Sequence, residues 1–196
     1  MAKRAFDLIF SITGLIVFAP VMLAVGIIIL ITLGRPVLYS PQRAGRGNKL
    51  ITVYKFRSMR LAPGPTSHHS GDDDPRVTTV GRWTRKFKFD ELPQLWNVLK
   101  GDMSIVGPRP ETPDYIQHYT EEQLKILEIR PGITDFASIE FADLGEMLKG
   151  DDPDKLYFEI VWDRKMELRM QYMRTRTFWL DIKILLFTFF LIFKRK

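Results

Sequence analysis

Residues 89–110 read FDELPQLWNVLKGDMSIVGPRP, and this stretch decides how the rest of the chain is interpreted. Its apolar residues recur at helical spacing, Pro93 falls in the first turn where no N–H is needed, and Gly101 follows the last apolar position. The pattern predicts a short helix that Asp90 and Glu91 open. A helix N-terminus can hold phosphate, or keep a carboxylate ionised and nucleophilic. Helix capping explains two acidic residues equally well, so the stretch alone leaves both interpretations open.

Short motifs within this stretch and on both sides of it decide between the two interpretations. They are YKFRSM (54–59), DELPQ (90–94), NVLKGDMS (97–104), GPRP (107–110), RPGIT (130–134) and LDIK (180–183). In wording and order they resemble the bacterial sugar transferase family, the monotopic phosphoglycosyl transferases that begin glycan and exopolysaccharide assembly. The resemblance covers nearly the full chain. It implies an Mg²⁺-dependent enzyme that moves a sugar-1-phosphate from a UDP-sugar to polyprenol (undecaprenyl) phosphate. UMP is released, and a covalent aspartyl-phosphosugar forms as intermediate.

The length and composition fit a membrane-associated protein with one catalytic domain. The chain has 196 residues, no cysteine, a net charge of +6 and a pI near 9.5. The absence of cysteine excludes disulfides and thiol chemistry. Basic residues stand beside apolar runs, at 3–4, at 174 and 176, and at 194–196, which favours anionic lipid headgroups as partners. No nucleic-acid recognition motif is present, so nucleic acid is not expected as a partner.

The N-terminal apolar run is a candidate membrane segment. No residue between Asp7 and Arg35 is charged, and at about 1.5 Å per helical residue the run can cross a hydrocarbon core of about 30 Å. A spanning helix is therefore one possibility. Pro20 near the middle, with basic residues at both ends, favours a re-entrant helix-break-helix over residues 1–36. The family has a Ser-Pro pair at the apex of such a hairpin; Ala19 and Pro20 stand there in this chain.

The remaining residues, 37–196, are expected to form a cytosol-facing catalytic domain of α+β class that is predominantly helical. Residues 37–42 and 50–56 predict the two strands of a small β-hairpin. A mobile loop is expected over 62–75, and its histidines and aspartates do not suggest a metal cluster. The apolar C-terminal segment, about 178–193, is short and contains charges, which is typical of an interfacial amphipathic helix; a buried core helix is the alternative.

The resemblance assigns roles to three carboxylates. Asp90 is the expected nucleophile, because a carboxylate can form an acyl phosphate. Glu91 either binds the metal or takes a proton from the incoming polyprenol phosphate. Mg²⁺ prefers a few hard oxygen ligands together with substrate phosphate, so Asp90 and Glu91 are its expected ligands. Asp181 is a candidate third ligand by its family position, or simply a polar residue at the membrane surface.

Four basic residues are candidates for phosphate binding. A helix is expected over 83–89, which places Arg85 one turn before the acidic pair, and Arg109 stands between two prolines that restrict it. Lys55, on a predicted strand, either contacts phosphate or extends its amine to solvent. Arg130 precedes the Pro-Gly turn of the RPGIT motif and is expected near sugar or nucleotide, although a salt bridge explains it as well.

The chain also departs from the family pattern after this turn. Residues 135–138 read DFAS where relatives commonly have Gly-Leu and then a Gln, so sugar specificity does not carry over. Two other functions remain open, a membrane-anchored adaptor and a nucleotide-sugar pyrophosphatase that uses water. The expected location is the bacterial cytoplasmic membrane, with the catalytic domain on the cytoplasmic face. The sequence does not indicate the sugar or the oligomeric state.

Overall fold

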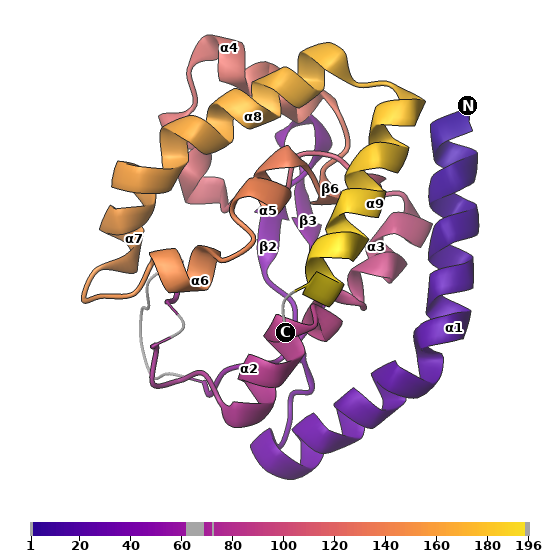
Figure 1. The fold of residues 1–196 in the computed structure, drawn as a ribbon, viewed down its shortest axis with the longest axis vertical. Coiled ribbons are helices and arrows are strands. Elements are labelled where there is room, and N and C mark those ends of the chain that lie inside the picture. The colour runs from indigo at the N-terminus through magenta and orange to yellow at the C-terminus, as the bar shows by residue number, and fades with distance from the viewer. Residues whose placement is uncertain (1, 62–68, 72, 195–196) are drawn as a thin grey trace.

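The computed structural model describes residues 2–61, 69–71 and 73–194. It is mostly helical, with short strands, as predicted (Figure 1). The helices are α1 (Ala2–Leu33), α2 (Thr79–Lys86), α3 (Gln94–Lys100), α4 (Glu121–Leu124), α5 (Phe136–Glu140), α6 (Leu144–Met147), α7 (Pro153–Leu156), α8 (Trp162–Thr175) and α9 (Phe178–Lys194). The strands are β1 (Leu38–Tyr39), β2 (Gln42–Ala44), β3 (Leu50–Thr52), β4 (Lys55–Phe56), β5 (Ser104–Val106) and β6 (Gly132–Thr134). Most of the loop expected over 62–75 and part of the basic end 194–196 lie outside the described residues.

The predicted β-hairpin is confirmed as two consecutive antiparallel ladders. β1 pairs with β4 and β2 with β3, and Gly47 takes the left-handed conformation (φ 66°) in the turn between β2 and β3. A parallel pair, β5 with β6, joins segments far apart in the sequence and was not predicted. The backbones of these two segments approach so closely that a Cβ on Gly132 would lie 2.1 Å from the backbone nitrogen of Gly107. The RPGIT motif therefore needs its glycine to build this pair.

Helix α1 is long and apolar enough to cross a membrane by length and composition, which suggests membrane association. The helix continues through Pro20, so the expected break at Ala19 and Pro20 is not an interruption of helical structure. Instead α1 bends: its first part runs beside α3 and α9, and its second part turns toward α2 (Figure 1). Proline removes one donor from a helix and bends it, which such a long helix tolerates. Large apolar side chains on its outer face are exposed, among them Ile16, Leu23 and Ile31.

Polar residues attach the start of α1 to the rest of the protein. The buried Asp7 accepts hydrogen bonds from the hydroxyl of Ser104 and the backbone N–H of Ile105, both at 3.0 Å. Arg4 donates to the carbonyl of Val98 at 2.7 Å and to the next carbonyl at 3.0 Å, both in the last turn of α3. Arg4 therefore stabilises the C-terminal end of α3, where the helix dipole is negative, and this corrects its expected role as a lipid-headgroup contact.

Helix α9 has one packed and one exposed face. Asp181 and Ile184 are buried against the body, whereas Trp179, Phe187 and Phe190 are between 60% and 73% exposed. Its packed face contacts α5, β5 and β6, and its aromatic residues also meet those of α1. An amphipathic C-terminal helix was predicted, and this division of faces agrees with it; its position at a membrane surface stays a prediction.

Candidate active site

Asp90 and Glu91, hereafter the dyad, lie in a 3-10 turn, η2 (Phe89–Glu91), between α2 and α3. Helix α2 ends at Lys86, and Lys88 takes the left-handed conformation (φ 57°) that directs the chain into this turn. The helix predicted over 83–89 is therefore wrong in its last turn. Leu92 and Pro93, between this turn and the first residue of α3, Gln94, both have right-handed helical conformations. The dyad therefore lies in a 3-10 turn that leads directly into α3, which agrees with the prediction that it opens the helical run.

Two cations hold the side chain of Glu91. Arg109 donates from Nη1 to Oε2 at 2.8 Å and from Nη2 to Oε1 at 2.5 Å, and the Nζ of Lys55 lies 3.2 Å from Oε1. Burial would raise the pKa of Glu91, but Arg109 and Lys55 hold it well below its ordinary value. Burial lowers the pKa of Arg109, but the charge of Glu91 and its hydrogen bond with Arg109 outweigh burial, so the pKa of Arg109 lies above its ordinary value. The pair is therefore ionised at neutral pH.

Asp90 is in a different environment from its neighbour. Its side chain is buried, and Oδ1 has no hydrogen-bond partner within the described ranges. Burial, followed by the charge of Glu91, raises the pKa of Asp90 to about 6, against the opposing effect of nearby cations. The lone pairs of Oδ1 are not used by the described residues.

Arg85 lies close to the dyad without bonding to it. Its Nε donates to the hydroxyl of Ser58 at 2.9 Å, and Nη1 lies 3.3 Å from the hydroxyl of Ser70. Its charge still lowers the pKa of Asp90, together with those of Lys55 and Lys88. Three of the four predicted phosphate-binding residues, Lys55, Arg85 and Arg109, are thus gathered around the dyad.

Arg130, the fourth predicted phosphate-binding residue, lies away from the dyad. Its Nε donates to the carbonyl of Gly101 at 2.9 Å, at the far end of α3 from the dyad. It lines a separate open groove together with Arg46, Lys49 and Asp102. The structure therefore does not place Arg130 among the groups that contact the dyad.

Asp181, the expected third metal ligand, is not brought to the dyad either. It receives hydrogen bonds from Lys3 at 2.5 Å and from the hydroxyl of Tyr172 at 2.7 Å, and so joins α9 to α1 and α8. Among the described residues no group of three His, Cys, Asp or Glu is placed to hold a metal. The dyad alone still fits Mg²⁺, because this ion commonly uses one or two carboxylates with substrate phosphate and water. The unbonded Oδ1 of Asp90 supports that fit.

One buried residue that sequence reasoning missed fixes the strand that carries Lys55. The side-chain oxygen of Asn97 accepts the backbone N–H of Tyr54 at 3.0 Å, and its nitrogen donates to the carbonyl of Thr52 at 2.6 Å. Asn97 is completely buried. The available signal was an amide at an otherwise apolar position of a short helix, which needs hydrogen-bond partners if buried.

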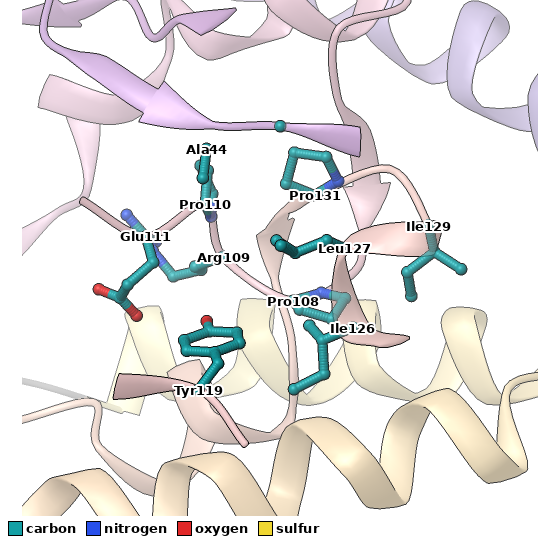
Figure 2. Close-up of a pocket in the computed structure, with 11 residues that line it drawn as sticks. Ala44, Pro108, Arg109, Pro110, Glu111, Tyr119, Ile126, Leu127, Ile129 and Pro131 are labelled. Atoms are coloured by element: carbon teal, nitrogen blue, oxygen red, sulfur yellow. The ribbon is translucent and has the colours of Figure 1, made fainter. Parts of the chain in front are cut away.

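A small pocket behind Arg109 is not large enough for substrate. Its volume is about 10 Å³, close to that of one water molecule. Figure 2 shows the residues that line it, which come from the hairpin, from the Pro-Arg-Pro segment and from residues between 119 and 131. It is a packing gap between neighbouring segments and not a binding site for a sugar nucleotide.

Comparison with known proteins identifies the family of this chain. The sequence profile described as "Bacterial sugar transferase" matches residues 1–195. The chain is 38% identical to an undecaprenyl-phosphate glucose phosphotransferase of Komagataeibacter xylinus, over 96% of this chain and 35% of that protein. It is 38% identical to the uncharacterized sugar transferase EpsL of Bacillus subtilis, over 95% of this chain and 84% of EpsL. It is also 36% identical to an undecaprenyl-phosphate galactose phosphotransferase of Salmonella typhimurium, over 98% of this chain.

The chain spans only 40% of that Salmonella protein, so several relatives are more than twice as long as the part they share with it. The shared part nevertheless includes the whole arrangement of hairpin, dyad and Pro-Arg-Pro segment. From the profile match over residues 1–195 we conclude that this chain belongs to the bacterial sugar transferase family.

Proposed function

We propose that the protein transfers a sugar-1-phosphate from a UDP-sugar to a polyprenyl phosphate, with Asp90 as the nucleophile. The observation that carries the proposal is the buried, unbonded carboxylate oxygen of Asp90 next to a Glu91 that two cations hold ionised. Family membership and the names of the relatives, which act on undecaprenyl phosphate, support the same reaction.

The proposed reaction has two displacements at one phosphorus atom. An oxygen of Asp90 attacks the phosphorus next to the sugar, and the bond from this phosphorus to the oxygen of UMP breaks. Asp90 then carries the phosphosugar as an acyl phosphate. An oxygen of polyprenyl phosphate attacks the same phosphorus, the acyl-phosphate bond breaks, and the carboxylate of Asp90 is restored. The product is polyprenyl-diphosphate-sugar.

The cations around the dyad have defined roles in this proposal. The guanidinium of Arg109, with 27% of its side chain exposed, presents a planar set of donors to phosphate oxygens beside Glu91. Lys55 adds a point charge, and Arg85 lowers the pKa of Asp90 from a distance. Mg²⁺ held by the dyad and substrate phosphates would neutralise charge on the diphosphate.

The proposal places the reaction at the bacterial cytoplasmic membrane, on its cytoplasmic face. The exposed apolar residues of α1 and the bend in this helix support a re-entrant segment over 1–36 that enters and leaves on one side. The exposed aromatic face of α9 would lie at the headgroup level beside it. In this arrangement an apolar acceptor reaches the dyad without leaving the membrane.

A burst experiment on the full chain in detergent tests the proposal. Wild-type protein mixed with Mg²⁺ and a panel of UDP-sugars, without acceptor, should release about one UMP per active site. Mass spectrometry of the quenched protein should find the phosphosugar on the peptide that contains Asp90. Asp90→Asn should lose burst and adduct, whereas Asp102→Asn, a partly exposed carboxylate paired with Lys100, should keep both.

Each other outcome identifies a different function. Continuous UMP release without acceptor would indicate a pyrophosphatase. No release with any UDP-sugar, with or without polyprenyl phosphate, would favour a non-catalytic adaptor. Transfer that requires both substrates together, without a burst, would refute the covalent route.

A further inference from the structure

The main chain of Arg109 is held from both sides by buried charged residues of distant segments. The N–H of Arg109 donates to Oδ2 of Asp135 at 3.2 Å, and its carbonyl accepts from Nη2 of Arg169 at 2.9 Å. Asp135 precedes α5, Arg169 lies on α8, and each is 1% exposed. The Nε of Arg169 lies 3.8 Å from Oδ2 of Asp135, so the two charges also attract each other. We call this arrangement of Asp135 and Arg169 the Arg109 clasp.

Arg169 also forms hydrogen bonds with side chains that follow Arg109 in the sequence. Its Nη1 donates to Oε2 of Glu111 at 2.7 Å and to the hydroxyl of Tyr119 at 3.1 Å. In Figure 2, Glu111 and Tyr119 lie on the same side of the segment that carries Arg109. Burying such charges costs several kcal/mol per ion, and apolar residues of similar size often give equal or greater stability. Stability alone therefore does not account for a charged network at this place.

The guanidinium of Arg109 is oriented by the segment that leads to Asp135. Besides Glu91, it donates to the carbonyl of Ile133 at 2.9 Å, two residues before Asp135. The turn that holds the main chain of Arg109 thus also orients its side chain. A group that binds phosphate in a transition state must be placed to within about 0.5 Å, so the position of this main chain matters for activity.

We propose that Asp135 and Arg169 are positioning residues that act through Arg109, an inference that rests on the proposed transfer reaction. In the described part of the chain, neither Asp135 nor Arg169 forms a hydrogen bond or ion pair with the dyad. Both bind the main chain of Arg109, whose side chain binds Glu91.

The two oxygens of Asp135 have separate tasks, which makes a selective test possible. Oδ1 accepts from the N–H of Ser138 at 2.7 Å and from its hydroxyl at 2.6 Å, and so caps α5. Oδ2 faces Arg109 and Arg169. Asp135→Asn can keep the cap but places an NH₂ group opposite the donors of both arginines. Ser138→Ala is the matched control, because it removes a hydrogen bond from the capping oxygen alone.

A double-mutant cycle between Asp135 and Arg109 tests the clasp. The full chain in detergent is prepared as wild type, Asp135→Asn, Arg109→Lys and the double variant. The kcat/KM for UMP release and the affinity for UDP with Mg²⁺ are measured for each protein. Asp135→Asn should lower kcat/KM about tenfold when Arg109 is present, and less than about twofold when Lys replaces it. Ser138→Ala should leave kcat/KM within about twofold.

Equal losses in both backgrounds would overturn the proposal, because they would mean that Asp135 does not act through Arg109. An equal loss in Ser138→Ala would also overturn it. If Asp135→Asn does not fold, Arg169→Lys takes its place, with Arg164→Lys as control; Arg164 lies on the same helix and pairs only with surface carboxylates in the described chain. A wild type that transfers nothing would refute the proposed function instead, and the coupling would then be measured in the affinity for UDP.

Discussion

Replacing Arg109 should reduce stability as well as activity, and a second substitution should restore part of the stability alone. Arg109→Met leaves Glu91, whose side chain is 12% exposed, with Lys55 at 3.2 Å as its remaining cation. Removing one partner of a buried ion pair costs about 3–5 kcal/mol. Because 27% of the Arg109 side chain is exposed and Lys55 remains, we expect about 2 kcal/mol. For a chain of this size that lowers Tm by about 4–8 °C.

Glu91→Gln in the Arg109→Met background removes the charge that was left without its partner. We expect this double variant to regain about half of the lost Tm while turnover stays as low as in the single variant, since the planar donors of Arg109 are missing from both and Lys55 offers only a point charge. Thermal unfolding in detergent and UMP release are measured on the same preparations. A single variant as stable as wild type, or a double variant no more stable than the single one, would refute this account of the Arg109–Glu91 pair.

Three further predictions concern the membrane segment, acid stability and helix packing. Ala2→Cys and Leu38→Cys, in a chain without native cysteine, should both be labelled from the cytoplasmic side; labelling from opposite sides would contradict a re-entrant α1. Although burial opposes it, the cationic partners of Glu111 hold its pKa well below its ordinary 4.5. The resulting stability is present above that pH and should be lost as pH falls below it, so Tm should drop between pH 5 and 3 in wild type but less in Glu111→Gln. Gly81→Ala, usually favourable inside a helix, should be destabilising here because the new Cβ would lie 1.8 Å from the carbonyl oxygen of Ser58; an unchanged Tm would contradict this packing.

The hairpin and the grouping of the site were predictable because their signals are local. Alternating residues around a glycine-rich turn predicted strands that the structure pairs through Gln42 and Thr52. The resemblance to the family marked Lys55 and Arg109 as phosphate-binding residues of one site, and the structure places both within hydrogen-bond distance of Glu91, a contact that was not predicted. Their catalytic roles stay predictions until the burst experiment is done.

The features that sequence reasoning missed depend on contacts between distant segments. The spacing of residues 83–89 is helical, and only the left-handed Lys88 ends α2 early; such a conformation is rare outside glycine and has no pattern signal. Asp181 carries a charge that suits a metal, but its partners Lys3 and Tyr172 come from elements packed against it in three dimensions. Arg169 likewise reads as one more basic residue on a surface helix until its burial is known.

The polar contacts of α1 can form only late in the synthesis of the protein. Asp7 and Lys3 are synthesised about a hundred residues before their partners Ser104 and Val106 leave the ribosome. During that interval both charges must remain hydrated, because an unpaired charge in hydrocarbon costs several kcal/mol. In the re-entrant arrangement proposed above, the start of α1 would therefore stay at the membrane surface while its apolar continuation inserts. The rest of the protein would then fold onto a segment that the lipid has already positioned.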